Sequence, residues 1–196
     1  WENSIDTSKS PYRTLVSYKE THANAKIDPL PTVWTGTWRD PRPINPERTK
    51  PENALTGTIF TVNGERDDAI MVPAQFGRHR FWRNTAIAAL QPGETAILPQ
   101  GTLGYEWDED LDNGFRPAGI MHLSETIVDN VQYIQDHRSV YDSGSGTHHL
   151  VLFRVRSGAM VFGAGTVQYT WGLDNFHDNF TGVPAEQANR YGIRVG

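Results

Sequence analysis

Cysteine is absent from the 196 residues of this chain. Disulfide bonds, thiolate nucleophiles and zinc sites built on thiolates are therefore excluded. Long apolar runs are absent as well, because the longest are only a few residues, so we expect no membrane span. Positive charge is scarce: the net charge of -5 argues against a broad nucleic-acid-binding or membrane-binding face, and we expect no nucleic-acid partner.

Aromatic residues, in contrast, are plentiful. Phe, Trp and Tyr make up 11% of the chain within a hydrophobic fraction of 37%, which is not the composition of a disordered protein. The length suits one domain with a sizeable core, so we predict a single domain over residues 1–196. The chain starts at Trp1 and stops in an alternating stretch, residues 191–196, that has barely begun. We therefore expect this domain to be a fragment of a longer protein.

Short strands outnumber helices in the sequence pattern. Alternating or β-branched runs predict strands at residues 14–18, 55–63, 69–73, 80–85, 95–99, 121–128, 148–158 and 159–167. The Ser-Gly pair at 157–158 predicts a turn that joins the last two strands into a hairpin. Residues 85–90 suit a strand or a helix, and short helices are expected within residues 19–28 and 185–192.

Residues 29–53 form a proline-rich segment with six prolines. Because proline lacks a backbone donor and interrupts regular structure, we expect a long ordered loop here. Trp34 and Trp38 should pin part of this loop, since tryptophan is seldom left exposed.

The stretch GTLGYEWDEDLDNG, residues 101–114, combines five carboxylates with two large aromatic side chains. Its Asp residues resemble the start of a calcium-binding loop, but Asn113 and Gly119 stand where that motif needs Gly and Glu. The segment from Asp108 to Asp112 equally suits a solvated acidic turn. Glu106 differs because it lies between Tyr105 and Trp107: a carboxylate desolvated by aromatic rings must be paired, protonated or bound to a metal.

Two other motifs favour structural roles. His148 and His149 are adjacent on an expected strand, so they point to opposite faces and do not readily share one metal ion. We expect one of them in the core and the other exposed. The G-x-G of Gly163 and Gly165 lacks the third glycine and the following helix of a dinucleotide site, so a tight bend or close packing on another backbone is the better interpretation.

Several stretches together resemble one family, the C-terminal domain of the N,N-dimethylformamidase large (beta) subunit. The stretches are RTLVSYKETHANAKIDP (13–29), TGTWRDPR (35–42), ENALTGTIFTVNG (52–64), FWRNT (81–85), GTLGYEWDEDLDNGFRPAG (101–119) and FGAGTVQYTWGLD (162–174). The resemblance covers essentially all 196 residues. It implies an α/β fold like that of class I glutamine amidotransferases, of which this chain would be the strand-rich C-terminal part.

The resemblance also implies an activity and a cofactor. The characterised relative hydrolyses a small amide at a mononuclear iron held by two tyrosines and one glutamate. The two tyrosines are expected to precede Trp1, and the glutamate matches Glu106 in the context Gly-Tyr-Glu-Trp-Asp, residues 104–108. Phenolate and carboxylate oxygens suit a hard ion such as Fe(III). The resemblance therefore implies Glu106 as a metal ligand.

Two hypotheses follow from the sequence. The first is a metal-dependent amide hydrolase related to N,N-dimethylformamidase, which acts on a small amide substrate. The second is a non-catalytic adhesion or glycan-binding module, in which exposed tryptophans stack on a ligand. Because members of the family occur in large exported bacterial proteins with immunoglobulin-like modules, the resemblance favours an extracellular or periplasmic location. It also suggests the upstream part of the same polypeptide as a partner.

Overall fold

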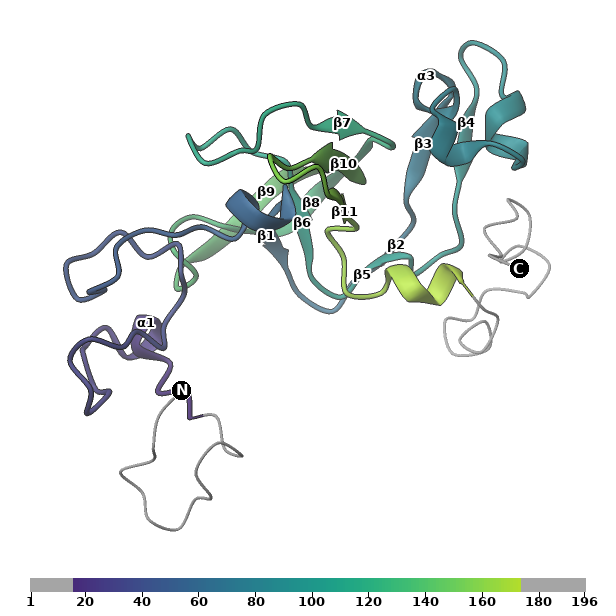
Figure 1. Cartoon of the computed structure of the whole chain (residues 1–196). Coiled ribbons are helices and arrows are strands. Elements are labelled where there is room, and N and C mark those ends of the chain that lie inside the picture. The colour runs from purple at the N-terminus through teal and green to yellow at the C-terminus, as the bar shows by residue number, and fades with distance from the viewer. Residues whose placement is uncertain (1–15, 174–196) are drawn as a thin grey trace. The chain divides into compact units, whose positions relative to one another are not determined.

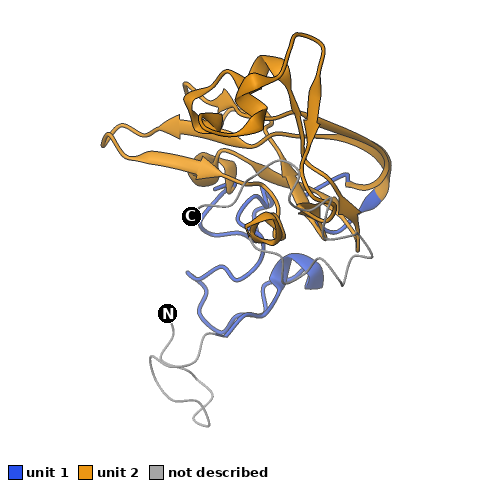
Figure 2. Cartoon of the chain, turned by 90° about the vertical axis from the view of Figure 1, so that its right-hand side faces the viewer, with its two compact units in different colours: residues 1–51, 134–141 blue, residues 52–133, 142–196 orange. Residues whose placement is uncertain are grey.

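The computed structural model describes residues 16–173 of the chain (Figure 1). It consists of two compact units (Figure 2). Unit 1 takes residues 1–51 and 134–141, and unit 2 takes residues 52–133 and 142–196, of which residues 1–15 and 174–196 lie outside the described part.

The regular elements are short. The α-helices are α1 (Glu20–Ala23), α2 (Asn53–Thr56) and α3 (Ala74–Gly77), and the 3₁₀-helices are η1 (Arg80–Trp82), η2 (Ala86–Ala89) and η3 (Tyr169–Gly172). The strands are β1 (Ile59–Asn63), β2 (Asp67–Asp68), β3 (Met71–Pro73), β4 (Thr95–Ile97), β5 (Leu103–Gly104), β6 (Trp107–Glu109), β7 (Met121–His122), β8 (Thr126–Ile134), β9 (Tyr141–His148), β10 (Val151–Arg154) and β11 (Met160–Gly163). No helix within residues 16–173 is long and apolar enough to cross a membrane.

The strands form four small sheets. One has the order β6-β1-β8-β9, a second has the order β11-β10-β7, and β2-β5 and β3-β4 are two-stranded. The pairs whose register is resolved are antiparallel. The strand-rich character that the sequence predicts is therefore confirmed. The parallel sheet of an α/β domain is not found in residues 16–173, where each α-helix has four residues, too few for a crossover between parallel strands.

Several predicted elements are confirmed and others are wrong. The predicted hairpin exists as β10 and β11, with Val151 opposite Gly163. The strand predicted at 80–85 is the 3₁₀-helix η1 instead, and residues 16–18 are not a strand. The helix predicted at 185–192 lies outside the described residues.

The hydrophobic core belongs to unit 2. Each side chain of this core is at most 2% exposed to solvent, and Trp82 and Trp107 are among them. The indole N–H of Trp82 donates to the carbonyl of Leu123 at 2.9 Å, so the ring is fixed as well as buried. Trp34 of unit 1 is also buried, so Trp34, Trp82 and Trp107 are not exposed faces on which a ligand could stack.

Unit 1 is organised by buried polar groups. The carboxylate of Glu20 is fully buried and accepts hydrogen bonds from the backbone N–H groups of Ile27, Asp28 and Thr35 at 3.0–3.1 Å. Lys26 donates to it at 2.9 Å. Burial alone would raise the pKa of Glu20, but these donors outweigh that effect and lower the pKa to about 2.

A second buried carboxylate, Asp40, holds the proline-rich loop. Arg42 donates to its two oxygens, with the shortest contact at 2.7 Å. In the same loop Trp34 is buried and its indole N–H donates to the carbonyl of Thr37 at 2.8 Å, as expected of a pinning residue. The expectation is wrong for Trp38, which is 61% exposed.

The G-x-G motif has the structural role that the sequence indicates. Gly163 lies in β11, where an added Cβ would come within 2.5 Å of the carbonyl oxygen of Thr56, so the two backbones are in close contact. Gly165 adopts φ 59°, a left-handed conformation that glycine takes without strain.

The hairpin supplies a test of the core. Val151 is fully buried and Arg156 is exposed. We expect Val151→Asp to place an unpaired charge in the core and to prevent folding, because a loss of more than ~4 kcal/mol exceeds what a marginally stable domain tolerates. Arg156→Ser should change the free energy of unfolding by less than ~0.5 kcal/mol. Urea unfolding of both variants is the measurement, and equal midpoints would contradict the assignment.

Candidate functional site

Glu106 lies on the tight turn between β5 and β6 in unit 2. Tyr105 precedes it with φ 63°, a left-handed conformation that is uncommon for a residue with a side chain. The backbone N–H of Tyr105 donates to the carbonyl of Arg66 at 2.7 Å, which fixes the turn. Trp107 then enters the core with no exposed surface. The turn therefore separates a buried ring from an exposed one.

The burial expected of Glu106 is only half realised. Its side chain is half-buried, because Tyr105 is 47% exposed and does not close over it. The phenol of Tyr105 instead donates to the carboxylate of Glu65 at 3.1 Å. That hydrogen bond and, to a smaller extent, the charge of Glu106 raise the pKa of Tyr105. The carboxylates of Glu65 and Glu106 therefore both lie close to the side chain of Tyr105 at this turn.

The carboxylates after Glu106 hold strands together. Asp108 accepts a hydrogen bond from the hydroxyl of Thr58 at 2.9 Å. Glu109 is buried and accepts hydrogen bonds from the phenol of Tyr133 and the backbone N–H of Thr147, both at 2.5 Å. These two acids are therefore occupied by structural partners.

The hypothesis of a solvated acidic turn is wrong for Asp110. Its carboxylate is 1% exposed and forms a bidentate pair with Arg116 at 2.6 and 2.7 Å. His122 Nε2 lies 2.7 Å from the same carboxylate. Burial alone would raise the pKa of Asp110, but the hydrogen bonds from Arg116 and His122 outweigh it and lower the pKa below its usual range. Of the acids in this stretch, Asp112 is the exposed one that the hypothesis describes.

Two stacked histidines extend this cluster. The rings of His122 and His149 stack with centroids 3.7 Å apart, and His149 Nε2 lies 3.5 Å from the carboxylate of Glu125. Burial and the adjacent His122 lower the pKa of His149. A carboxylate at each end of two stacked imidazoles is an arrangement that can hold and exchange a proton.

The expectation that one of the adjacent histidines is exposed is wrong. His148 is fully buried and His149 is 8% exposed. They do face different neighbours: His148 Nε2 lies 2.8 Å from the carbonyl oxygen of Ala164, and its ring meets the edge of Trp107. Burial lowers the pKa of His148 to about 4, so this ring is neutral at physiological pH. Both rings are covered because β9 ends at His148, inside the packed part of unit 2.

Sequence reasoning missed most of this cluster. Asp110, Arg116, His122, Glu125 and His149 come from separate segments, and no spacing in the sequence signals that they meet. The one available signal was His122, which lies at the start of a predicted strand.

A complete metal site is not formed by His, Asp and Glu alone in the described part of the chain, since no three such side chains there are placed so that they could hold one ion. Glu106 itself fits one ligand position, because it is a half-buried hard oxygen donor on a fixed turn. Any site that includes Glu106 thus needs further ligands of another residue type or from outside residues 16–173.

The sequence model of a family described as "N,N-dimethylformamidase beta subunit-like, C-terminal" matches residues 1–181. The chain belongs to this family. The family resemblance that the sequence stretches indicate is therefore confirmed over nearly the whole chain. No curated protein and no solved structure matches the chain.

Asp110 offers a test of the cluster. We expect Asp110→Asn to lower the free energy of unfolding by about 3–5 kcal/mol, because it leaves the charge of Arg116 without its buried partner. Asp112→Asn is the matched control: Asp112 is exposed and accepts only a 3.3 Å hydrogen bond from Gly114, which an amide oxygen can also accept. Urea unfolding at pH 7 is the measurement, and equal losses would overturn the structural role of Asp110.

The pH dependence of the free energy of unfolding tests the pairing of Asp110 with Arg116 independently. The pKa of Asp110 in the folded protein lies below the ordinary 3.8. The stabilisation that its ionised carboxylate gives to the folded state is therefore fully present above pH 3.8 and is lost as the pH falls through the folded pKa. The unfolding free energy of the unmodified protein should therefore fall more steeply below pH 4 than that of Asp110→Asn.

Proposed function

We propose that the protein belongs to a metal-dependent amide hydrolase that acts on a small amide, with Glu106 as one carboxylate ligand of the metal. The observation that carries the proposal is membership, over residues 1–181, of the family named after the N,N-dimethylformamidase beta subunit. The proposal includes the class I glutamine amidotransferase-like relationship: the antiparallel strands of residues 16–173 would be the strand-rich part of that domain, and tyrosine ligands would come from elsewhere.

The turn around Glu106 supplies what a metal-binding carboxylate needs. Trp107 anchors the turn in the core, so the backbone that carries Glu106 is held by packing. Glu106 remains half-buried and is thus within reach of a small ligand. Glu65, which accepts a hydrogen bond from the phenol of Tyr105, adds a second carboxylate near the same turn, and carboxylate oxygens suit a hard cation.

The chemistry fits amide hydrolysis. A bound iron ion would polarise the amide carbonyl and lower the pKa of a coordinated water molecule. The contribution of this chain is to hold the anionic carboxylate of Glu106 in place. Tyr105 is 47% exposed, so its ring does not enclose the turn.

The direct test is Glu106→Gln, which keeps the side-chain volume but removes the charge. An amide oxygen is a far weaker ligand than a carboxylate for a hard trivalent ion, so we expect iron content and formamide hydrolysis to fall together. Asp112→Asn, the exposed neighbour in the same stretch, should leave both unchanged. Metal analysis of the purified full-length protein, which includes the part expected upstream of Trp1, and an assay for amine release from N,N-dimethylformamide are the measurements.

The outcome separates a ligand from a structural acceptor. If Glu106 only accepts hydrogen bonds, Glu106→Gln will cost about 1–3 kcal/mol of stability with the iron content unchanged. Retained iron together with retained activity would reject the ligand assignment.

A second candidate is a binding module for glycans, and it rests on Trp38. This tryptophan is 61% exposed and lines a pocket of about 460 Å³ in unit 1. The other lining residues are Val33, Trp34, Asn45, Glu47, Arg48 and Lys50. An exposed aromatic face beside polar side chains is a surface on which a sugar ring can stack. Such a module would suit an exported bacterial protein.

Trp38→Ala tests this candidate. It removes the stacking face from a side chain that is mostly exposed, so the fold should be retained. We expect binding of a neutral oligosaccharide such as cellohexaose, measured by calorimetry, to weaken at least tenfold. Leu55→Ala, which removes another large exposed side chain (69%), is the control. Absence of binding in the unmodified protein would exclude this function for that class of glycan.

A further inference from the structure

Strand β11 forms one edge of a three-stranded sheet in unit 2. Because the order of this sheet is β11-β10-β7, one side of β11 pairs with β10, and no strand within residues 16–173 pairs with the other side. The open side of an edge strand presents backbone N–H and C=O groups, which can pair with a strand of another chain. The outer side of β11 is therefore a candidate docking site for an extended polypeptide.

The turn of the hairpin shows which residues of β11 face the open side. The backbone N–H of Val155 donates to the carbonyl of Ala159 at 2.9 Å. Hydrogen-bonded pairs alternate with non-hydrogen-bonded pairs along an antiparallel ladder, so Val161 is the next residue of β11 whose backbone bonds to β10. The N–H and C=O groups of Met160 and Phe162 therefore point away from β10. No hydrogen bond joins these groups to any other residue in the described part of the chain.

The side chains beside this edge form an exposed apolar surface. Leu152 of β10 lies opposite Phe162 on one side and Met121 on the other, so the three side chains form one row on one face of the sheet. Phe81 of η1 extends this row, because its ring stacks on that of Phe162 with centroids 5.3 Å apart. The exposed fractions are 37% for Phe162, 39% for Phe81, 41% for Met121 and 47% for Met160. Large exposed apolar side chains that gather on one face mark an interaction site.

Two segments around this surface carry positive charge and no carboxylate. Residues 74–93 include η1, residues 150–173 include β10 and β11, and neither segment contains Asp or Glu. The stacking of Phe81 on Phe162 brings the two segments into contact. Their arginines are exposed to solvent and form no ion pair with any described residue: Arg78, Arg80, Arg83, Arg154 and Arg156.

Two of these arginines flank the apolar row directly. Arg154 lies opposite Met160 in the ladder, so the two residues share one face of the sheet, and Arg80 precedes Phe81 in η1. Asp110, which contacts the third strand of the sheet, is 1% exposed and already holds a salt bridge. The exposed charge beside the open edge is therefore positive, in a chain whose net charge is -5.

We propose that β11 binds an extended acidic segment of a partner protein, which adds a fourth strand to the sheet through the outer side of β11. Backbone groups of the partner would pair with those of Met160 and Phe162. An apolar side chain of the partner strand would lie against the ring of Phe162, because directly opposite residues share one face of a sheet. Carboxylates two positions away lie on the same face and would form charge-assisted hydrogen bonds with the arginines.

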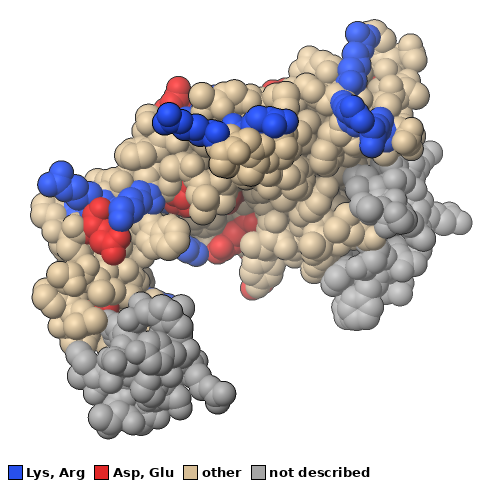
Figure 3. Space-filling model, viewed as in Figure 1, with Lys and Arg blue, Asp and Glu red and all other residues tan. Residues whose placement is uncertain are grey.

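Three other occupants match the surface less well. A second copy of this chain would bring the same arginines against one another. A lipid surface offers no hydrogen-bond partners for the backbone groups of the edge, and such groups are costly to leave unpaired in lipid. A nucleic acid needs a continuous basic stripe, whereas the Lys and Arg side chains on the face drawn in Figure 3 form separate groups. An acidic polypeptide strand satisfies the backbone, the apolar row and the arginines together.

The test uses a capped peptide of sequence Glu-Thr-Glu-Thr-Phe-Thr-Glu-Thr-Glu, whose Glu and Phe side chains share one face when the peptide is extended. Calorimetric titration of the purified full-length protein should show binding that added salt weakens. Two control peptides carry Lys in place of Glu or N-methyl groups on the backbone amides, and each should bind at least tenfold more weakly. Equal binding of the Lys peptide would overturn the acidic partner, and equal binding of the N-methylated peptide would overturn the added strand. Sedimentation of the protein with phosphatidylglycerol vesicles, without binding of the Glu peptide, would assign the surface to a membrane instead.

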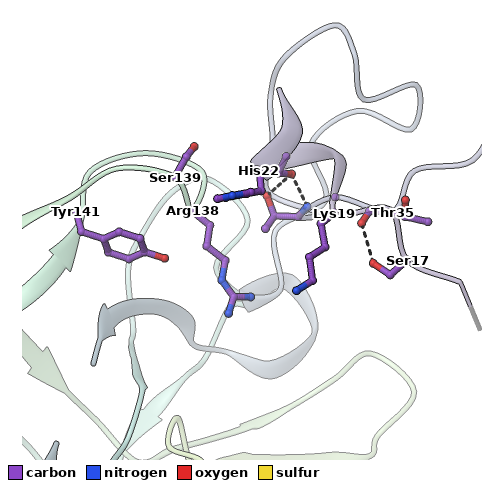
Figure 4. Close-up of a pocket in the computed structure, with 10 residues that line it drawn as sticks. Ser17, Lys19, His22, Thr35, Arg138, Ser139 and Tyr141 are labelled. Carbon is purple, nitrogen blue, oxygen red and sulfur yellow. Dashed lines mark hydrogen bonds between the residues drawn. The ribbon is translucent and has the colours of Figure 1, made fainter. Parts of the chain in front are cut away.

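Paired variants show whether the peptide binds at this surface. Arg80→Gln combined with Arg154→Gln removes two exposed cations, and we expect it to lower the affinity for the Glu peptide at least tenfold with an unchanged melting temperature. The control, Lys19→Asn combined with Lys50→Gln, removes two exposed cations of unit 1 and should leave the affinity unchanged. Lys19 lines a pocket of about 570 Å³ in that unit (Figure 4).

Met160→Pro tests the backbone contact. The N–H of Met160 points away from β10, so proline at this position removes a donor of the open edge and no hydrogen bond of the ladder. We expect Met160→Pro to bind the Glu peptide at least tenfold more weakly than Met160→Ala, which shortens the side chain but keeps the N–H. Unchanged affinity both in Met160→Pro and in the double variant of Arg80 and Arg154 would place the peptide elsewhere and overturn the proposal.

Discussion

The constraint on which this structure depends is the pairing of buried carboxylates with backbone N–H groups. Residues 24–52 contain neither helix nor strand, so their N–H groups lack the usual repeating partners. The carboxylate of Glu20 replaces those partners at three positions, because it accepts hydrogen bonds from the backbone N–H groups of Ile27, Asp28 and Thr35. Because an ionised carboxylate without donors could not stay buried, the carboxylate and the loop stabilise each other. The lowered pKa of Glu20 reflects this dependence.

The acidic side chains of residues 101–114 in unit 2 also differ in whether hydrogen-bond donors surround them. Glu109 and Asp110 point inward, where Tyr133, Thr147, Arg116 and His122 satisfy them. Glu106, by contrast, stays half-buried on the turn that the backbone hydrogen bond from Tyr105 to Arg66 fixes. Removal of Glu109 or Asp110 should disturb the fold, whereas removal of Glu106 should disturb function first.

Residues with positive φ shape turns in both units. Tyr105, with φ 63°, precedes Glu106 in unit 2, and Arg138, with φ 102°, lies in a turn of unit 1. Such positions aim a side chain where regular structure would not, and their cost must be offset by surrounding contacts. In unit 1 the turn of Asp136 supplies those contacts.

Some elements could be predicted from sequence because their signals are local. The hairpin of β10 and β11 has two apolar runs and a Ser-Gly turn, and β4 follows the turn at residues 92–93. Strand β9 was missed because its sequence, YDSGSGTH, has no apolar alternation, and its place in the sheet comes from its neighbours. The sequence also predicts a strand at residues 80–85, yet Trp82 reaches the core from a 3₁₀-helix.

The sequence by itself determined the family, the strand-rich character and the identity of Glu106 as the acid flanked by aromatic rings, since these depend on residues close together in the chain. Only the tertiary structure decided which acids are buried. Asp110 and Asp112 look alike in sequence, but Asp110 meets His122 and Arg116 while Asp112 meets solvent. Burial of a charge is stable only where donors converge on it, and that convergence exists only after segments distant in the chain have packed together.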